Sequence, residues 1–175
     1  MSLEIIMGCM YSGKSTELMR RVRRLQSIGM RCLVVNHTND VRVQGDFVQS
    51  HTGHKMSATK TDDIMLVDGR AFDAVAIDEA QFFSNLKSAV LLLVQKYKKH
   101  VIVAGLNGDY RRATFGELLE LVPHADDILF TRALCSSCCH PGRPASFTKR
   151  ISDETETVSV QGTYRAVCRV CLEKE

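Results

Sequence analysis

The stretch Gly8-Cys9-Met10-Tyr11-Ser12-Gly13-Lys14-Ser15 decides the fold, because it fits the pattern G-x-x-x-x-G-K-S in full. A short apolar strand, Glu4 to Met7, precedes it, and apolar positions at helical spacing predict a helix from about Lys14 to Ile28. Glycines in such a turn let backbone N–H groups close around phosphate oxygens, and the helix N-terminus adds a favourable field. Lys14 is expected to reach the β- and γ-phosphates of ATP, and the Ser15 hydroxyl to bind Mg²⁺. The residues of this phosphate-binding loop (P-loop) expected to contact ATP are Gly8, Met10, Tyr11, Ser12, Gly13, Lys14, Ser15 and Thr16.

A second motif follows the predicted strand Phe72–Ile77, which ends at Asp78-Glu79. A carboxylate at the end of such a strand faces the P-loop, and Asp78 is therefore a candidate Mg²⁺ ligand. Glu79 can accept a proton from the attacking oxygen or orient it. Together with the P-loop, the two acids indicate an enzyme of phosphoryl transfer.

The order of the remaining elements indicates an α/β fold. Strands alternate with helices, which predicts a mainly parallel, RecA-like sheet with helices on both faces. Residues 38–62 are polar and are expected to form a long loop. The other predicted strands are Arg31–Val35, Val101–Ala104 and Ile128–Leu134, and the other predicted helices run from a cap at Ser84 to about His100 and from Phe115 to Val122, where Pro123 stops it.

Four of the seven cysteines form two pairs, Cys135-x2-Cys138 and Cys168-x2-Cys171. Two such pairs are typical of a tetrahedral Zn²⁺ site. Cys139 leaves a second choice of ligand open, although Cys138 gives the matching spacing. The pattern predicts a P-loop domain over residues 1–134 and a zinc ribbon with a long loop over residues 135–175.

Composition excludes several classes of protein. The N-terminus has no basic stretch before its short apolar segment, so no signal peptide is expected. No apolar run approaches the roughly 20 residues of a membrane span, and we expect a cytoplasmic protein whose cysteines bind metal. The net charge of +3 does not indicate nucleic-acid binding. The basic run after Glu17 is interpreted as a solvated helix face supported by a Glu17–Arg21 pair.

Two functions share these motifs. Asp78-Glu79-Ala80-Gln81 also resembles the DEAx box of helicases, so a nucleic-acid-dependent ATPase with a zinc ribbon is the alternative to a kinase. At 175 residues the chain is too short for the two domains with which helicases clamp a strand. The P-loop and the acids cannot separate transfer to water from transfer to an alcohol, because both reactions use them. A pocket for the acceptor must decide.

The combination and order of motifs resemble the small zinc-containing thymidine kinases of cells and large DNA viruses, over nearly the whole chain. Beyond the P-loop and the cysteine pairs, the resemblance rests on Ser15–Arg24, Asn39–Arg42, Asp78–Phe83, Gly105–Arg112, Phe115-Gly116, Phe147–Arg150 and Tyr164.

The resemblance implies a role in nucleotide salvage for DNA synthesis: transfer of the γ-phosphate of ATP to the 5′-hydroxyl of thymidine, with Mg²⁺ and a structural Zn²⁺. Glu79 would be the general base and Arg42 would bind the transferring phosphate. It also implies a homotetramer inhibited by dTTP. No nucleic-acid or membrane partner is expected. The positions that it assigns to the thymidine pocket are Met10, Leu106, Phe82, Tyr110, Phe115, Thr148 and Tyr164, with Val158, Val160, Gln161 and Gly162 of a lasso-like loop between the cysteine pairs.

Overall fold

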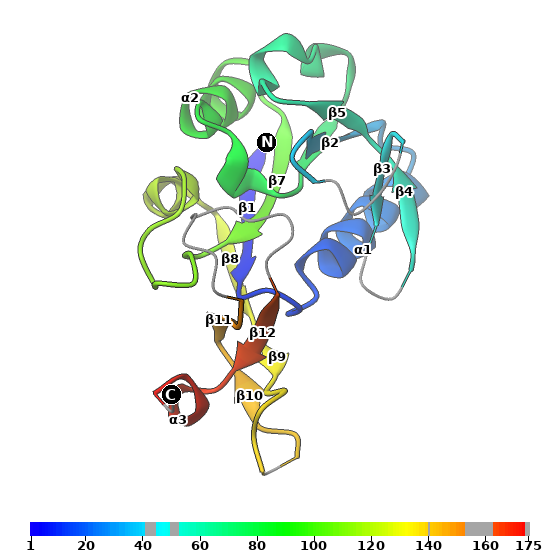
Figure 1. Ribbon diagram of the computed structural model, residues 1–175. Helices are drawn as coiled ribbons and strands as arrows, with labels where there is room; N and C mark the ends of the chain where they lie inside the picture. The colour runs from blue at the N-terminus through cyan, green and yellow to red at the C-terminus, as the bar shows by residue number, and fades with distance from the viewer. Residues whose placement is uncertain (41–44, 50–52, 140, 153–162, 174–175) are drawn as a thin grey trace.

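A parallel sheet of six strands forms the centre of the protein, in the order β5-β2-β6-β7-β1-β8 (Figure 1). The computed structural model describes residues 1–40, 45–49, 53–139, 141–152 and 163–173. The strands of the sheet are β1 (Ser2–Gly8), β2 (Cys32–His37), β5 (Thr59–Thr61), β6 (Ala74–Ile77), β7 (His100–Leu106) and β8 (Asp127–Thr131). The predicted α/β class with a mainly parallel sheet is confirmed.

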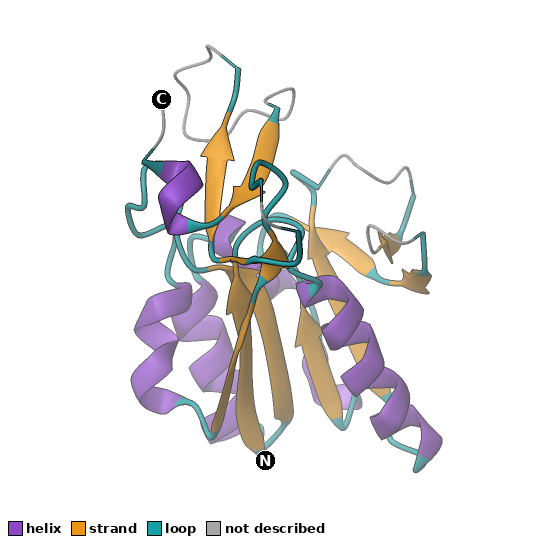
Figure 2. Cartoon of the chain, turned by 90° about the horizontal axis from the view of Figure 1, so that it is seen from below, coloured by secondary structure: helices purple, strands orange, loops and turns teal. Residues whose placement is uncertain are grey.

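In the central strands of the sheet, successive residues point into different cores, so both faces of these strands are buried. Ile5 packs with helices on one face, whereas Ile6 packs with α1 on the other. The first face is covered by α2 (Leu86–Leu91), the π-helix η4 (Leu92–Lys96) and the 3₁₀ helix η5 (Leu118–His124). The second is covered by α1 (Lys14–Ser27), so that helices lie on both sides of the sheet (Figure 2). Among the described residues, no helix has the length and apolar character that crossing a membrane requires.

Ion pairs, as well as apolar packing, hold helix α1 against the sheet. Arg21 pairs with Glu17 at 2.9 Å on its own helix, as predicted, and also with Asp127 of β8 at 2.8 Å. Glu4 of β1 forms a further pair with Arg21. The helix ends before Gly29, whose φ of +84° suits a left-handed helix end.

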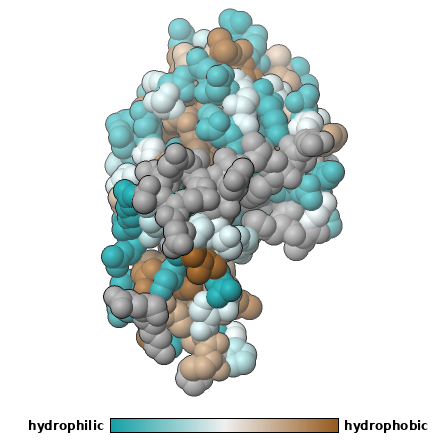
Figure 3. Space-filling model, in the orientation of Figure 1, coloured by the Kyte–Doolittle hydropathy of each residue, from teal (hydrophilic) through white to brown (hydrophobic). Residues whose placement is uncertain are grey.

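A separate group of short elements follows the sheet, and we call it the cysteine module. It contains β9 (Ala133–Leu134) paired with β10 (Pro144–Ala145), β11 (Phe147–Arg150) paired with β12 (Tyr164–Val167), and α3 (Arg169–Leu172). It projects from one end of the sheet (Figure 1). Apolar residues are visible on its surface in the space-filling view (Figure 3), and Leu134 is 66% exposed. The module thus buries its apolar residues less completely than the sheet does.

The prediction of one long loop over residues 38–62 is wrong in part. It contains a hairpin of β3 (Phe47–Gln49) and β4 (Lys55–Ser57), and then β5, which joins the sheet beside β2. Val48 and Ala58 are buried and pack against the same core as α1. Strands of three residues are too short to show a periodic pattern, and it is their tertiary packing that stabilises them.

The boundaries of two helical segments also differ from prediction. Asn85, not Ser84, occupies the N-cap of α2, and the helical segment ends at Lys96 because His100 already pairs with β1 and β6. Gly116 has a φ of +63°, which delays the next helix to Leu118. Pro123 lies inside that 3₁₀ helix, where the loss of one N–H donor does not end it.

The predicted strand Ile128–Leu134 is divided at Arg132. Its first part, β8, stays in the parallel sheet, and its second part, β9, pairs with β10 in the cysteine module. Thr131 and Arg132 interrupt the apolar residues of this segment at the point where the chain leaves the sheet.

Candidate active site

Two glycines shape the loop between β1 and α1, for different reasons. A Cβ on Gly8 would lie 2.2 Å from the carbonyl oxygen of Thr131, so only glycine lets β1 end this close to β8. Gly13 has a φ of +84° and is the N-cap of α1, with nothing within 4 Å of a Cβ. Its constraint is therefore conformational and not steric. The pattern recognised in the sequence forms a loop at a helix N-terminus, the arrangement that binds phosphate.

Lys14 is buried at the start of α1. Its Nζ donates a hydrogen bond to the carbonyl oxygen of Cys9 at 2.7 Å, and Ser12 Oγ donates to the same oxygen at 2.8 Å. The lysine ammonium is thus held against the loop. An ammonium with three donors on a flexible stem can exchange this carbonyl for phosphate oxygens. Ser15 is half-buried, Thr16 is exposed on the first turn of the helix, and Tyr11 is 45% exposed.

The cysteine module contacts this loop directly. The backbone N–H of Met10 donates to Thr148 Oγ1 of β11 at 3.0 Å. The Cys9 thiol donates to the carbonyl oxygen of Ala145 at 3.4 Å, and burial raises the pKa of Cys9, which keeps it protonated. Parts of the chain about 136 residues apart therefore hold the conformation of the loop.

Asp78 and Glu79 follow β6, which is separated from β1 in the sheet only by β7. Their place at the carboxyl ends of neighbouring parallel strands is where ligand sites of open α/β sheets form. Asp78 is 1% exposed, and Glu79 is half-buried. Glu79 has a φ of 51° and a ψ of 39°, a left-handed conformation that is unfavourable for a residue other than glycine and is common at functional sites.

The side chains predicted to line a nucleoside pocket are brought together in pairs. Phe82 and Phe115 meet edge to face, with ring centroids 5.6 Å apart. Met10 and Thr148 share the hydrogen bond described above. Leu106 lies at the end of β7, within the same region of the sheet as Asp78 and Glu79.

Arg150 links two further residues predicted for the pocket, Tyr110 and Tyr164. Its guanidinium carbon lies 3.9 Å from the centre of the Tyr110 ring and 5.1 Å from that of Tyr164, and its Nη2 donates to the Tyr164 hydroxyl. Arg150 was not predicted as a site residue. The only signal for it in the sequence was its place in Phe147–Arg150, one of the segments on which the family resemblance rests.

His37 is another residue that the prediction missed. Its ring lies 5.5 Å from that of Phe82 and 4.7 Å from that of Phe83, and its Nδ1 accepts from the N–H of Asn39 at 2.9 Å. Burial lowers the pKa of His37, so the ring supports the aromatic residues as a neutral group. No motif in the sequence marks this histidine, because its partners follow a different strand.

The four cysteines of the two pairs form one cluster. The Sγ atoms of Cys135, Cys138, Cys168 and Cys171 all lie within 4.8 Å of one another. Such spacing fits thiolates around one metal ion, with metal–sulfur bonds of about 2.3 Å for zinc. Cys139 is exposed and lies outside the cluster, so the structure favours Cys138 as the ligand of the first pair.

Hydrogen bonds support the cluster. The backbone N–H of Cys168 donates to Cys135 Sγ at 3.2 Å. Burial opposes ionisation of Cys135, but this bond and others from its neighbours outweigh burial and lower its pKa to about 7. Hydrogen bonds thus favour the thiolate of Cys135, whereas burial and the adjacent thiols raise the pKa of Cys171.

Several predicted residues lie outside the described part of the chain. These are Arg42 of the phosphate site and Val158, Val160, Gln161 and Gly162 of the lasso-like loop.

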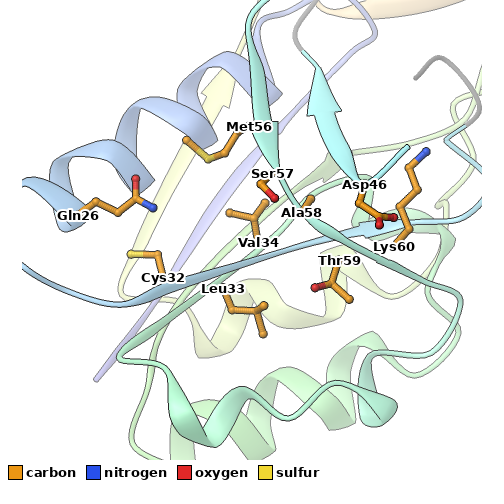
Figure 4. A pocket seen from close by; sticks show the side chains of 10 residues that line it. All are labelled: Gln26, Cys32, Leu33, Val34, Asp46, Met56, Ser57, Ala58, Thr59 and Lys60. Atoms are coloured by element: carbon orange, nitrogen blue, oxygen red, sulfur yellow. The ribbon is translucent and has the colours of Figure 1, made fainter. Parts of the chain in front are cut away.

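A hollow of about 590 Å³ lies apart from these residues, between α1, β2 and the β4–β5 segment (Figure 4). Its lining includes Gln26, Cys32 and Met56 but no residue of the P-loop, the acidic pair or the cysteine cluster. The site is therefore defined by the convergence of the motifs and not by this hollow.

Comparison with known proteins agrees with the geometry. The family described as thymidine kinase matches residues 1–172. The chain is 38% identical to the cytosolic thymidine kinase of Cricetulus griseus, over 99% of this chain and 74% of that protein. It is 39% identical to that of Gallus gallus, over 97% of this chain and 75% of the relative. It is 36% identical to the thymidine kinase of raccoon poxvirus, over 99% of this chain and 97% of the viral protein.

Proposed function

The chain belongs to the thymidine kinase family, and from that membership we propose that it transfers the γ-phosphoryl group of ATP to the 5′-hydroxyl of thymidine, giving thymidine monophosphate and ADP. The observation that carries the proposal is the family match over residues 1–172, which includes both the P-loop and the four-cysteine cluster. The loop from Gly8 to Thr16 and the acidic pair Asp78-Glu79 lie at the same end of one parallel sheet, which supports the proposal.

The phosphates of ATP bind to the N–H groups of the loop from Gly8 to Thr16. Lys14 exchanges the Cys9 carbonyl for oxygens of the β- and γ-phosphates, and Arg42 contacts the phosphoryl group in transfer. Ser15 and Asp78 would hold Mg²⁺, since hydroxyl and carboxylate oxygens are the donors that this cation prefers. When bound, Mg²⁺ neutralises charge that develops on the phosphate oxygens.

Glu79 takes the proton from the 5′-hydroxyl as the oxygen attacks the γ-phosphorus. The new bond joins the nucleoside oxygen to phosphorus, and the bond from that phosphorus to the β-phosphate oxygen breaks. ADP leaves with the electron pair of the broken bond. The strained backbone of Glu79 supports this assignment, because nearby packing must maintain an unfavourable conformation.

The thymine base binds between the apolar side chains of Met10 and Leu106 and the aromatic rings of Phe82, Tyr110 and Phe115, with Thr148 and Tyr164 from the cysteine module. The edge-to-face pair of Phe82 and Phe115 supports one wall of this pocket. The backbone of Val158, Val160, Gln161 and Gly162 reads the polar edge of the base.

The four clustered cysteines would hold Zn²⁺, for which a tetrahedral set of thiolates is a typical structural site. We infer two functional units, with residues 1–134 binding ATP and residues 135–175 closing over the nucleoside. Closure of such a segment excludes water from the transferring phosphoryl group.

We further propose that the protein acts in the cytoplasm as a homotetramer inhibited by dTTP, without nucleic-acid or membrane partners. The names of its cellular relatives, cytosolic thymidine kinases, support the location.

The proposal is tested by incubating the purified protein with Mg·ATP and each common nucleoside, and separately with single-stranded DNA. ADP formed in equal amount to thymidine monophosphate is the expected result. ADP formation stimulated only by DNA, without a nucleoside monophosphate, would replace the kinase with the nucleic-acid-dependent ATPase.

A further inference from the structure

Gln81 is a buried polar residue beside Glu79. Its side chain is 3% exposed, and its Nε2 donates a hydrogen bond to Glu79 Oε2 at 2.6 Å. At its other end, Oε1 accepts a hydrogen bond from the backbone N–H of Leu106 at 2.9 Å. The amide therefore connects the carboxylate after β6 with the end of β7.

The direction of this amide is fixed by its partners. A backbone N–H can only donate, so the amide oxygen must face Leu106, and the NH₂ group must then face Glu79. A carboxylate that accepts from an amide forms a charge-assisted bond, which is stronger than a bond between neutral groups. The structure thus gives Glu79 a donor whose position does not depend on a mobile side chain at the surface.

The surroundings leave little freedom for Gln81. A Cβ on Gly105 would lie 2.8 Å from Gln81 Oε1, and a Cβ on Gly116 would lie 2.3 Å from the Gln81 carbonyl oxygen. Ala80 and Phe83 on either side of the amide are fully buried in the core. These contacts fix the conformation of the short helix η3 (Ala80–Phe82). They also maintain the left-handed backbone of Glu79, the residue before this helix.

We propose that Gln81 is a positioning residue, which holds the Glu79 carboxylate in the orientation in which it takes the proton from the nucleoside. This inference rests on the proposed function, in which Glu79 is the base. Because the amide is also bonded to Leu106, it fixes the base relative to one wall of the proposed thymidine pocket. A misplaced catalytic group loses rate steeply, by about a hundredfold for 1 Å.

Two variants separate positioning from a purely structural role. Gln81→Met keeps the length of the side chain but removes both hydrogen bonds, and we expect kcat to fall by about 10- to 100-fold with KM for thymidine and ATP nearly unchanged. Gln81→Glu keeps an acceptor for the Leu106 N–H but replaces the donor with a second carboxylate oxygen. If the role is positioning, kcat of Gln81→Glu falls at least as far as that of Gln81→Met. If Gln81 only satisfies Leu106, Gln81→Met loses stability but keeps the wild-type kcat, and the proposal is wrong.

A double-mutant cycle with Glu79→Gln completes the test. We expect Glu79→Gln alone to reduce kcat by at least about a hundredfold, the usual contribution of a positioned base. Gln81→Met should then cause less than about a twofold further loss in the Glu79→Gln background, because residues that act as a unit are not additive. A full additional loss would overturn the positioning role.

The cycle also separates the inference from its premise. If Glu79→Gln keeps nearly the wild-type kcat, the assignment of the base fails, whatever Gln81 does. If Glu79→Gln loses activity and both Gln81 variants keep it, only the inference on Gln81 fails. Melting temperatures of all variants show whether a loss of kcat reflects unfolding.

Discussion

The central sheet and the cysteine module are stabilised by different means. The sheet buries large apolar residues on both faces, such as Leu3 and Ile77 on one and Ile6 and Ile102 on the other. The module's clusters consist mainly of small residues, such as Ala145 and Ala166, and of cysteines. So small a core rarely stabilises a fold without a metal or another cross-link.

The P-loop lies where these two regions meet. Its ends belong to β1 and α1 of the sheet, whereas Met10 is hydrogen-bonded to Thr148 of the module. We expect the sheet to determine whether the protein folds, and the module to determine whether the loop and the nucleoside pocket are complete. Changes in each region should therefore have different signatures.

The largest effect is expected from disruption of the four-cysteine cluster. Cys168→Ser should lose the bound metal and unfold the module, because binding of a structural zinc contributes about 10–16 kcal/mol in small zinc peptides. Thymidine phosphorylation should be abolished, while amides of β1 and β7 stay protected from hydrogen exchange. Elemental analysis, a kinase assay and hydrogen exchange measure these three effects.

Cys139→Ser is the matched control, because Cys139 is exposed and outside the cluster. It should keep the metal and the activity. Equal loss of metal in the two variants would mean that the ligands of the first pair are assigned incorrectly.

The next largest effect is expected inside the P-loop. Lys14→Ala should lower kcat/KM for ATP by about a thousandfold, as loss of a charge that stabilises the transition state does. Stability should change little, since the Cys9 carbonyl still accepts from Ser12 Oγ. Steady-state kinetics and a melting curve measure both quantities, with the exposed Lys96→Ala as control. An unchanged kcat/KM would contradict the assignment of the phosphate site.

A change in the sheet core should affect stability and leave the metal in place. Leu18 of α1 is fully buried, and Leu18→Ala should lower the free energy of unfolding by about 3 kcal/mol. At this chain length the melting temperature should fall by about 6–12 °C. Arg24→Ala, at an exposed position of the same helix, should change stability by less than about 0.5 kcal/mol. Loss of metal together with melting of Leu18→Ala at the lower temperature would show that the two regions unfold as one.

The smallest effect concerns the ion pairs of α1. Hydrogen bonds from Arg20 and Arg21 lower the pKa of Glu17 to about 2, against an ordinary value of 4.5. The unfolded chain therefore binds more protons between these values, so this stabilisation is complete above about pH 4.5 and is lost as the pH falls through about 2.

Glu17→Gln should remove no more than about 1 kcal/mol at neutral pH, because pairs this close to solvent are weak. Its melting temperature should differ from that of the wild type at pH 6 and converge with it as the pH approaches 2. Denaturation curves at several pH values measure the difference, and a constant difference would contradict the cause assigned to it.

Sequence and structure agree best where the chemistry depends on neighbours along the chain. The P-loop pattern, the acids after β6 and the strand–helix alternation were predicted from local order and were found as predicted. Prediction failed at β5 and at the division between β8 and β9. These segments are short, and their conformation is decided by the strand that lies beside them and not by their own periodicity.

The sequence by itself determined the phosphate-binding loop, the acidic pair, the two cysteine pairs and the family, since each rests on residues at fixed spacing. Only the tertiary structure chose Cys138 over Cys139, joined Met10 to Thr148 across 138 positions and placed Gln81 between Glu79 and Leu106. Those contacts join residues that follow different strands, and no local pattern records which strands lie side by side. A folded sheet brings their ends together, and that proximity, not the spacing along the chain, forms the site.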